Sequence, residues 1–217
     1  MPKVVLQRIY SRLFSAFGRQ YWWPGETRLE IIIGAILTQN TNWKNVERAI
    51  INLRKAKLLS FDPLLRVSLR KLAQLIRPSG YFNIKSKRLK NFIKFIEKDY
   101  GGSLTLLQKQ PMDKLRIEFL SVNGIGPETA DSILLYAFEK PVFVIDAYTK
   151  RLFYRYGIIG KDVKYEDLQE IFMQHLKADT QMFNEYHALI VKLAKEHCRS
   201  RPLCEKCPLE DTCRKRF

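Results

Sequence analysis

Cysteine is absent from the first 197 residues of this 217-residue chain, and its four cysteines all lie in the last 20. A disulfide framework ties distant parts of a small secreted chain together, so this distribution argues against one. Long apolar runs are also missing, because no stretch of about 18 or more apolar residues occurs. The N-terminal residues 1–5 lack the pattern of a cleaved leader. We therefore expect a soluble, cytoplasmic protein.

Acidic residues are scarce: 22 Asp and Glu stand against 38 Lys and Arg, which gives a formal net charge of +16. Such an excess favours a polyanionic partner, because each neutralised phosphate releases condensed counterions. Nucleic acid is the first candidate and an anionic membrane surface the second, while the alternative is that a basic pI only aids solubility. The 46% hydrophobic content supplies a core for one or two compact domains.

Strand-like segments are few. Apolar residues recur at three- and four-residue spacing in residues 46–53, 89–96 and 130–137, which predicts amphipathic helices. Residues 29–37 are apolar almost all round, and we expect a buried helix there. Residues 141–145 resemble a strand but have no second strand to pair with, so we expect an extended connection. The fold class is therefore all-α, with roughly ten helices joined by short links.

The four cysteines have the spacing Cys-x5-Cys-x2-Cys-x5-Cys, which suits one tetrahedral metal centre. Four thiolates hold either a structural zinc ion or an iron–sulfur cluster, and the spacing alone does not separate the two. Basic residues between the cysteines either contact phosphates or offset the thiolate charge. The predicted ligands are Cys198, Cys204, Cys207 and Cys213.

Residues 115–131 predict two helices joined by a hairpin that contains Gly124, Ile125 and Gly126. Glycines without a Cβ let the backbone approach a partner closely, and Pro127 suits a helix start. The free amides and the helix dipole then face an anion. A Gly-x-Gly sequence alone is also typical of an ordinary tight turn, but Pro127 and the following Glu-Thr-Ala favour contacts with DNA phosphates, and we include Thr129 among them.

This hairpin, the Asp146 that follows it and the terminal cysteines together resemble the endonuclease III family of DNA base-excision glycosylases over nearly the whole chain. The segment 37–41 resembles the helix end whose glutamine, here Gln39, fills the space left by an extruded base, with Asn40 beside it. The resemblance implies a [4Fe–4S] cluster. The family has six residues between its first two cysteines and this chain has five, so zinc remains the alternative.

The resemblance also bears on mechanism. Bifunctional members carry a lysine nucleophile at the position of Glu128, and a carboxylate cannot form a Schiff base. We therefore predict a monofunctional glycosylase without lyase activity. Asp146 matches the essential aspartate of the family, which stabilises positive charge on the sugar. From local sequence alone Asp146 is equally suited to cap a helix, and Glu128 is equally suited to a favourable first-turn charge or to a contact with the extruded nucleotide.

All three tryptophans lie in the first 43 residues. Segments around them resemble the 3-methyladenine glycosylase branch of the superfamily, whose members stack an alkylated base between aromatic walls. Alkylated purines are cationic, and a cation over an indole ring gains about 0.5–2 kcal/mol; ordinary core packing is the alternative for each tryptophan. We assign no motif role to any histidine. The predicted base pocket comprises Trp22, Trp23, Pro24, Trp43 and Glu128.

These features predict an enzyme that hydrolyses the N-glycosidic bond of 3-methyladenine, and also of 7-methylguanine, in double-stranded DNA. A mismatch-specific thymine or uracil glycosylase is the alternative, and a non-catalytic DNA-binding protein comes third. We expect a nucleoid-associated monomer with no membrane partner. A six-helix domain over residues 28–135 ends in the hairpin, and residues 1–27 and 136–217 form a discontinuous helical domain with the cluster loop.

Overall fold

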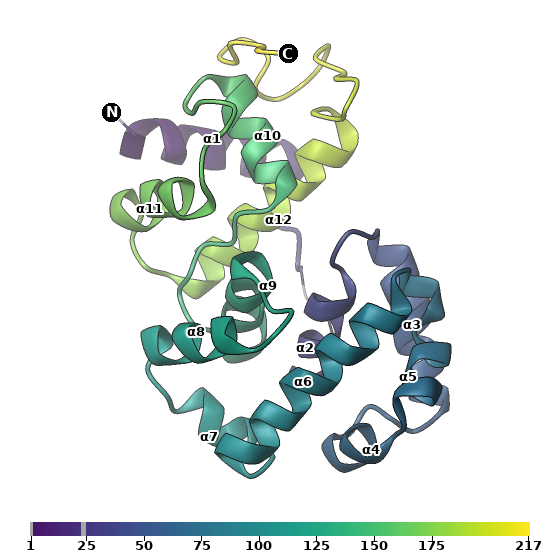
Figure 1. Cartoon of the computed structure of the whole chain (residues 1–217). Helices are drawn as coiled ribbons and strands as arrows, with labels where there is room; N and C mark the ends of the chain where they lie inside the picture. Colours follow the sequence, from purple (N-terminus) through teal and green to yellow (C-terminus); the bar gives the residue numbers. More distant parts are fainter. Residues whose placement is uncertain (1, 23–24) are drawn as a thin grey trace. The chain divides into compact units, whose positions relative to one another are not determined.

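The computed structural model describes residues 2–22 and 25–217, and every regular element within these two ranges is helical (Figure 1). This confirms the predicted all-α class. The helices are α1 (Pro2–Phe17), α2 (Arg28–Leu37), α3 (Trp43–Lys55), α4 (Phe61–Arg66), α5 (Leu69–Leu75), the 3₁₀ turn η1 (Arg77–Ser79), α6 (Phe82–Tyr100), α7 (Leu104–Gln108), α8 (Met112–Ser121), α9 (Pro127–Ser132), the π-helical turn η2 (Ile133–Ala137), α10 (Ala147–Tyr156), α11 (Tyr165–His175) and α12 (Thr180–Glu196).

The helices form two compact units that do not follow the order of the chain. One unit, the terminal unit, contains residues 1–22 and 141–217, and the other, the middle unit, contains residues 23–140. The chain therefore starts in the terminal unit, completes the middle unit and then returns.

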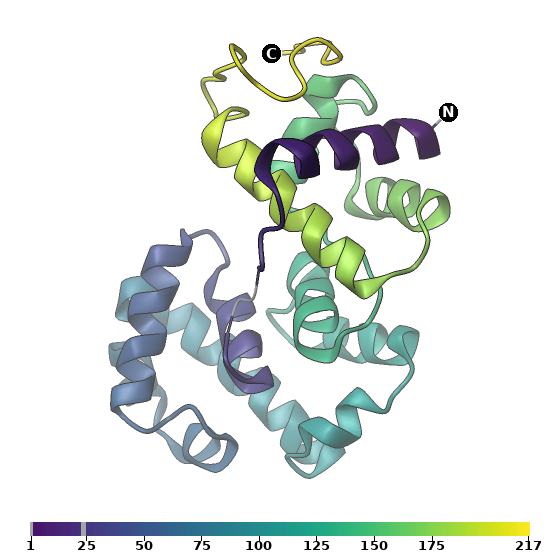
Figure 2. The same cartoon turned by 180° about the vertical axis from the view of Figure 1, so that it is seen from behind.

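The terminal unit is built around α12, whose buried face contacts α1 and α10 (Figure 2). Tyr186 of α12 is fully buried, and its hydroxyl donates a 2.9 Å hydrogen bond to the carbonyl of Leu6 in α1. Phe143 stacks on Phe172 of α11 with their ring centroids 3.8 Å apart. Aromatic packing of this kind fixes the extended segment 141–145 against the helices of this unit.

The middle unit contains the predicted helix over residues 29–37, which the structure confirms as α2. Thr27 caps it by accepting a hydrogen bond from the amide of Glu30, and nearly every side chain of α2 is buried. The long helix α6 packs against α2 and α5. Its Lys85 is 1% exposed and donates to the carbonyls of Leu37 and Ser79 at 2.8 and 2.7 Å. The ammonium group of Lys85 thus supplies a hydrogen-bond donor to the last carbonyl of α2.

The structure differs from the sequence expectations in two places. The helix expected over residues 130–137 widens into the π-helical turn η2 after Ser132. The described residues hold twelve α-helices where roughly ten were expected, because α4, α5 and α7 have only five to seven residues each. Helices this short contain too few apolar repeats to give a periodic signal.

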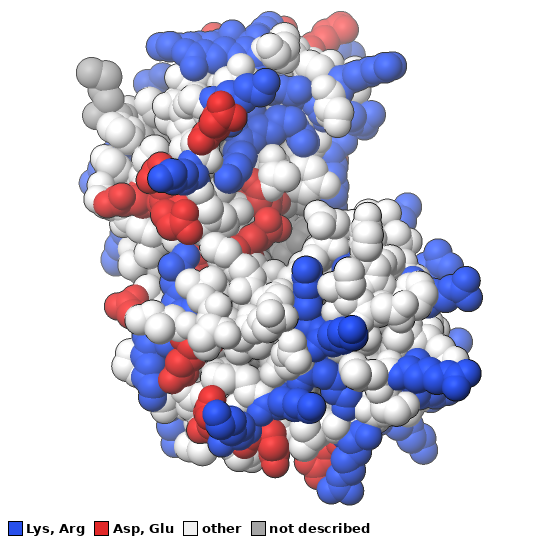
Figure 3. Space-filling model, viewed as in Figure 1, with Lys and Arg blue, Asp and Glu red and all other residues white. Residues whose placement is uncertain are grey.

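No helix in the described part of the chain combines the length and the apolar character that a membrane span requires. Charge is unevenly spread on the face shown in Figure 3. Lys and Arg side chains cover the C-terminal loop and parts of the middle unit, whereas acidic side chains gather near α11, whose first turn contains Glu166 and Asp167.

Candidate functional site

Asp146 lies where the extended segment 141–145 meets α10. No partner strand pairs with this segment among the described residues, and two side chains of α11 bind its backbone instead. Gln169 donates a 2.7 Å hydrogen bond to the carbonyl of Phe143, and the hydroxyl of Tyr165 accepts one of 3.3 Å from the amide of Ile145. These contacts set the position from which Asp146 starts the helix.

Both oxygens of the Asp146 carboxylate have a polar neighbour. Its Oδ1 accepts hydrogen bonds from the amide and the hydroxyl of Thr149, at 2.7 and 2.8 Å. Its Oδ2 lies 3.4 Å from Nε2 of His187 on α12. The side chains of Asp146 and His187 are only 12% and 8% exposed. The structure therefore contains the helix cap that local sequence allows and, at the same residue, a buried carboxylate next to an imidazole.

The ionisation of Asp146 follows from these contacts. Burial by itself raises the pKa of this carboxyl, but the charge and close approach of His187, together with the hydrogen bonds from Thr149, outweigh burial and lower the pKa below its ordinary value. The group is therefore an anion at neutral pH. A buried anion can stabilise a developing positive charge, and it is unsuited to donating a proton.

The hairpin connects α8 to α9 in the middle unit. Gly124 has a φ of +94°, and a Cβ at this position would lie 2.2 Å from Cγ of Arg88 on α6. Glycine is therefore required here both by the backbone and by the stem of Arg88. Ile125 is buried, and its amide donates to the carbonyl of Val122 at 3.0 Å. Gly126 is exposed and caps α9 with extended backbone.

The structure brings Gln39 to this hairpin. Its Nε2 donates hydrogen bonds to the carbonyl of Gly124 at 3.2 Å and to the hydroxyl of Thr129 at 2.9 Å. Its Oε1 accepts a hydrogen bond from the guanidinium of Arg88. Asn40 follows with a φ of +52° and an exposed side chain. Three of the predicted DNA-binding residues are thus neighbours, and sequence reasoning missed Arg88.

The predicted base-pocket residues are distributed over both units. Trp22 belongs to the terminal unit, where Nζ of Lys195 lies 5.7 Å from its ring centroid. Its indole Nε1 is buried and has no hydrogen-bond acceptor among the described residues. Trp43 begins α3 in the middle unit and is partly exposed. Trp23 and Pro24 lie outside the described residues.

Glu128 is exposed in the first turn of α9. This position agrees with a favourable interaction with the helix dipole and leaves the carboxylate accessible to solvent. The hairpin residues 122–128 contain no lysine.

The four cysteines lie on the loop that follows α12, shown in yellow in Figure 1. Arg155 of α10 donates to the sulfur of Cys198 at 3.5 Å, and the amide of Lys215 donates to the sulfur of Cys213 at 3.4 Å. Burial raises the pKa of Cys207, a backbone hydrogen bond from Leu209 opposes this effect, and the three other thiols raise the pKa further. The thiols are therefore electrostatic neighbours, although no group of three or more His, Cys, Asp or Glu within residues 2–22 and 25–217 is arranged to hold a metal ion.

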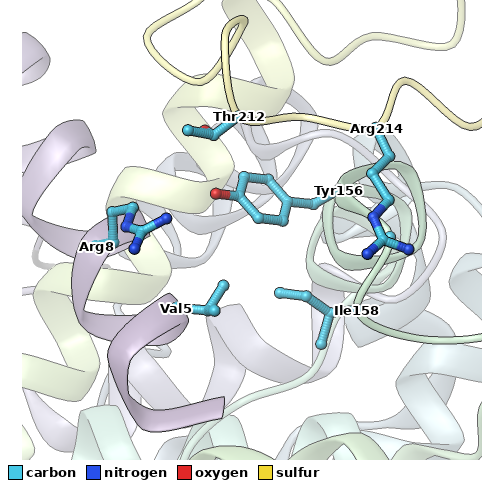
Figure 4. A pocket seen from close by; sticks show the side chains of 7 residues that line it. Val5, Arg8, Tyr156, Ile158, Thr212 and Arg214 are labelled. Carbon is cyan, nitrogen blue, oxygen red and sulfur yellow. The ribbon is translucent and has the colours of Figure 1, made fainter. Parts of the chain in front are cut away.

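A cavity of about 370 Å³ opens at the other end of α10 (Figure 4). It holds none of the residues predicted from the sequence. Ten residues of helix separate Asp146 from this cavity, a rise of about 15 Å, so the cavity is remote from the candidate carboxylate. The lining residues are Val5, Arg8, Tyr156, Gly157, Ile158, Thr212 and Arg214.

Comparison with known proteins identifies the family. Residues 33–178 match the HhH-GPD superfamily of base excision DNA repair proteins. The chain is 51% identical to a provisionally named DNA repair glycosylase of Methanocaldococcus jannaschii, over 96% of both chains. It is 30% identical to endonuclease III of Sulfolobus acidocaldarius, over 88% of this chain and 84% of that protein.

A solved structure supports the same relationship. The crystal structure of H. pylori 3-methyladenine DNA glycosylase bound to 1,N6-ethenoadenine superposes with a TM-score of 0.76 at 29% identity. The match covers 90% of this chain and 97% of that one. The hairpin with Gly124 and the capped Asp146 lie within the matched family region. The chain therefore belongs to the HhH-GPD superfamily of base excision repair proteins and is an endonuclease III-like DNA glycosylase.

Proposed function

We propose that this DNA glycosylase is monofunctional and hydrolyses the N-glycosidic bond of alkylated purines, 3-methyladenine first and 7-methylguanine second, in double-stranded DNA. The observation that carries the proposal is the buried, ionised carboxylate of Asp146 in a chain whose hairpin has Glu128 where a lyase needs lysine. The similarity to a 3-methyladenine DNA glycosylase supports the substrate class.

The proposed reaction needs little more than this carboxylate. An N3- or N7-alkylated purine is a cation, so the electron pair of the breaking C1′–N bond neutralises the departing base. Positive charge then develops on the sugar, and the anion of Asp146 stabilises it. A water molecule adds to C1′, oriented by the same carboxylate, and loses its proton to solvent. No covalent bond to the enzyme forms, and the DNA strand stays intact.

Substrate binding is proposed to use the residues that the sequence predicts for it. Gly124, Ile125, Gly126 and Thr129 contact DNA phosphates through the hairpin, a contact that carries no sequence information. Gln39 fills the space that the extruded nucleotide leaves, and Asn40 beside it contacts the DNA. The cationic base is proposed to stack against the residues predicted for base binding, which are Trp22, Trp23, Pro24, Trp43 and Glu128. The indole Nε1 of Trp22 supports this assignment, because it is a buried donor with no acceptor among the described residues and a base could accept its hydrogen bond.

The decisive experiment is chromatography of the bases released from dimethyl-sulfate-treated duplex DNA, with a parallel gel for strand scission. We expect release of 3-methyladenine or 7-methylguanine without nicking, and loss of release in Asp146→Asn. Release from oligonucleotides with thymine or uracil opposite guanine, and not from methylated DNA, would replace the alkyl-purine assignment with the mismatch activity. Tight binding without release from any substrate would mean a non-catalytic DNA-binding protein.

We also propose that the cysteine loop holds a [4Fe–4S] cluster, with Cys198, Cys204, Cys207 and Cys213 as ligands. The donor set of four thiols and the N–H groups directed at the sulfurs of Cys198 and Cys213 support it. Such a cluster would tie the loop to α10 and would take no part in base release. Purified protein should be brown, with four iron atoms per chain and absorbance at the blue edge of the visible. A colourless protein that contains one zinc ion would establish the alternative, and Cys207→Ser should remove either metal.

A further inference from the structure

The structure places a second titratable group at Asp146 that neither the motif nor the proposed reaction uses. His187 comes from α12, and its Nε2 lies 3.4 Å from Oδ2 of Asp146. Both side chains are about nine-tenths buried. We propose that His187 is a positioning residue for base excision, fixing the orientation of the Asp146 carboxylate through Oδ2. The inference rests on the proposed role of Asp146 in the reaction.

The hydrogen bonds at Asp146 explain why a second contact matters. Thr149 supplies two donors, and both bind Oδ1. A carboxylate held at one oxygen can still rotate about the bond to Cβ, because that torsion is broad. The imidazole at Oδ2 gives the second fixed point, so the plane of the carboxylate is defined from α10 on one side and from α12 on the other. At 3.4 Å this contact is long for a hydrogen bond, and the contacts of catalytic groups often tighten only in the transition-state complex.

The choice of imidazole also fits the chemistry. A buried carboxylate needs donors, since leaving it without them is costly. Lysine or arginine at position 187 would bring a permanent positive charge towards the forming cation of the sugar. An imidazole donates one hydrogen bond through Nε2, and unlike lysine or arginine it does not carry a permanent positive charge. His187 can therefore orient the carboxylate without adding a permanent positive charge at the site.

The test compares variants of the full-length protein in single-turnover base release and in affinity for lesion-containing duplex. His187→Leu removes the donor, whereas His187→Gln keeps an amide N–H near the position of Nε2. We expect His187→Leu to release base about 10- to 100-fold more slowly at saturating enzyme, with unchanged DNA affinity, because one hydrogen bond to a charged group is lost. His187→Gln should recover most of the rate. His175→Leu, in α11, is the matched control and should keep the wild-type rate.

Two outcomes would overturn the inference. One is a wild-type rate in His187→Leu. The other is equal loss of rate in the Leu and Gln variants together with an equal fall in thermal stability, as a purely structural histidine requires. If His187→Leu does not fold, His187→Asn replaces it, because its shorter amide cannot reach Oδ2. An Asn variant as active as the Gln variant then rejects the inference.

Failure of the proposed function gives a different pattern. If the wild type releases base but Asp146→Asn does so equally well, the assigned mechanism is wrong, and the His187 inference falls with it. If Asp146→Asn is inactive while His187→Leu is fully active, the mechanism stands and only the inference is rejected.

Discussion

The guanidinium of Arg88 donates a hydrogen bond to Oε1 of Gln39, and the stem of the same arginine covers Gly124. Gln39 is therefore engaged at both ends of its amide, since its Nε2 already binds Thr129 and the carbonyl of Gly124. If Gln39 enters the DNA as proposed, these hydrogen bonds must break and be replaced by contacts to the bases. The resting position of the side chain thus contributes to the cost of DNA binding.

A double-mutant cycle measures this pairing. Arg88→Met and Gln39→Met should each destabilise the DNA-free protein, with a coupling of about 1 kcal/mol in the free energy of unfolding, because they share one charge-assisted hydrogen bond. Urea unfolding of the wild type, both single variants and the double variant gives the value. Strict additivity of the two changes would contradict the contact.

The two hairpin glycines should respond differently to alanine. Gly124→Ala places a Cβ against Arg88 and keeps an unfavourable φ of +94°, so we expect a loss of about 1–3 kcal/mol in stability. Gly126→Ala meets no atom within 4 Å and has a φ of −97°, so its stability should change little. Thermal unfolding of both variants provides the comparison. Equal destabilisation would show that the contact with Arg88 is unimportant.

Lys85 should stabilise the fold and should not act as a lyase nucleophile. Lys85→Met leaves the carbonyls of Leu37 and Ser79 without their donor, which predicts a loss of about 2–4 kcal/mol in the free energy of unfolding. Lys87→Met, on the exposed side of α6, is the matched control and should stay within about 0.5 kcal/mol of the wild type in the free energy of unfolding.

Borohydride trapping of the wild type with abasic DNA should give no covalent complex. A complex lost specifically in Lys85→Met would mean that this lysine reaches the substrate.

The same lysine predicts a pH dependence. Burial, with a smaller contribution from Arg88, lowers the pKa of Lys85 to about 8. Between that pH and the ordinary lysine value near 10.5, the unfolded chain binds more protons than the folded one. The stability of the wild type relative to Lys85→Met should therefore rise as the pH increases from about 8 towards 10. Urea unfolding of the pair at several pH values tests the sign.

Asp146 predicts a dependence of stability on pH at the acid end of the range. Its pKa is lowered on folding, so the carboxylate contributes stability above the ordinary aspartate value near 3.8, and this contribution is lost as the pH falls through the folded value. The difference in unfolding free energy between the wild type and Asp146→Asn should be constant at neutral pH and shrink below about pH 4. A difference that already shrinks near pH 6 would mean that the pKa is raised.

The sequence predicts the parts of this molecule whose signals are local. Residues 29–37 are apolar on all sides and are long enough for a helix, and the structure has α2 there. The sequence also predicts the extended connection over residues 141–145. Its composition resembles a strand, but a strand without a partner is not stable. The glycines of the hairpin indicate a turn by their residue type alone, because glycine readily adopts a positive φ. These features need no knowledge of distant residues.

Contacts between distant residues are not visible in the same way. His187 lies among the buried residues of α12, and nothing near it in the sequence indicates that it faces Asp146. Arg88 is one of four cations within six positions of α6, and periodicity does not show which one contacts Gln39. Lys85 and Lys90 of the same group are buried, against the usual preference of lysine. In each case the partner is set by tertiary packing.

The double hydrogen bond from Thr149 to one oxygen of Asp146 makes the first turn of α10 and the carboxylate a single cooperative element. Helix ends open far more often than whole proteins unfold. Each opening of this turn would break the hydrogen bonds from Thr149 to the carboxylate and make the site inactive, while the rest of the fold stayed intact. Hydrogen exchange at the amide of Thr149 therefore reports the fraction of molecules that are ready to act, independently of any substrate.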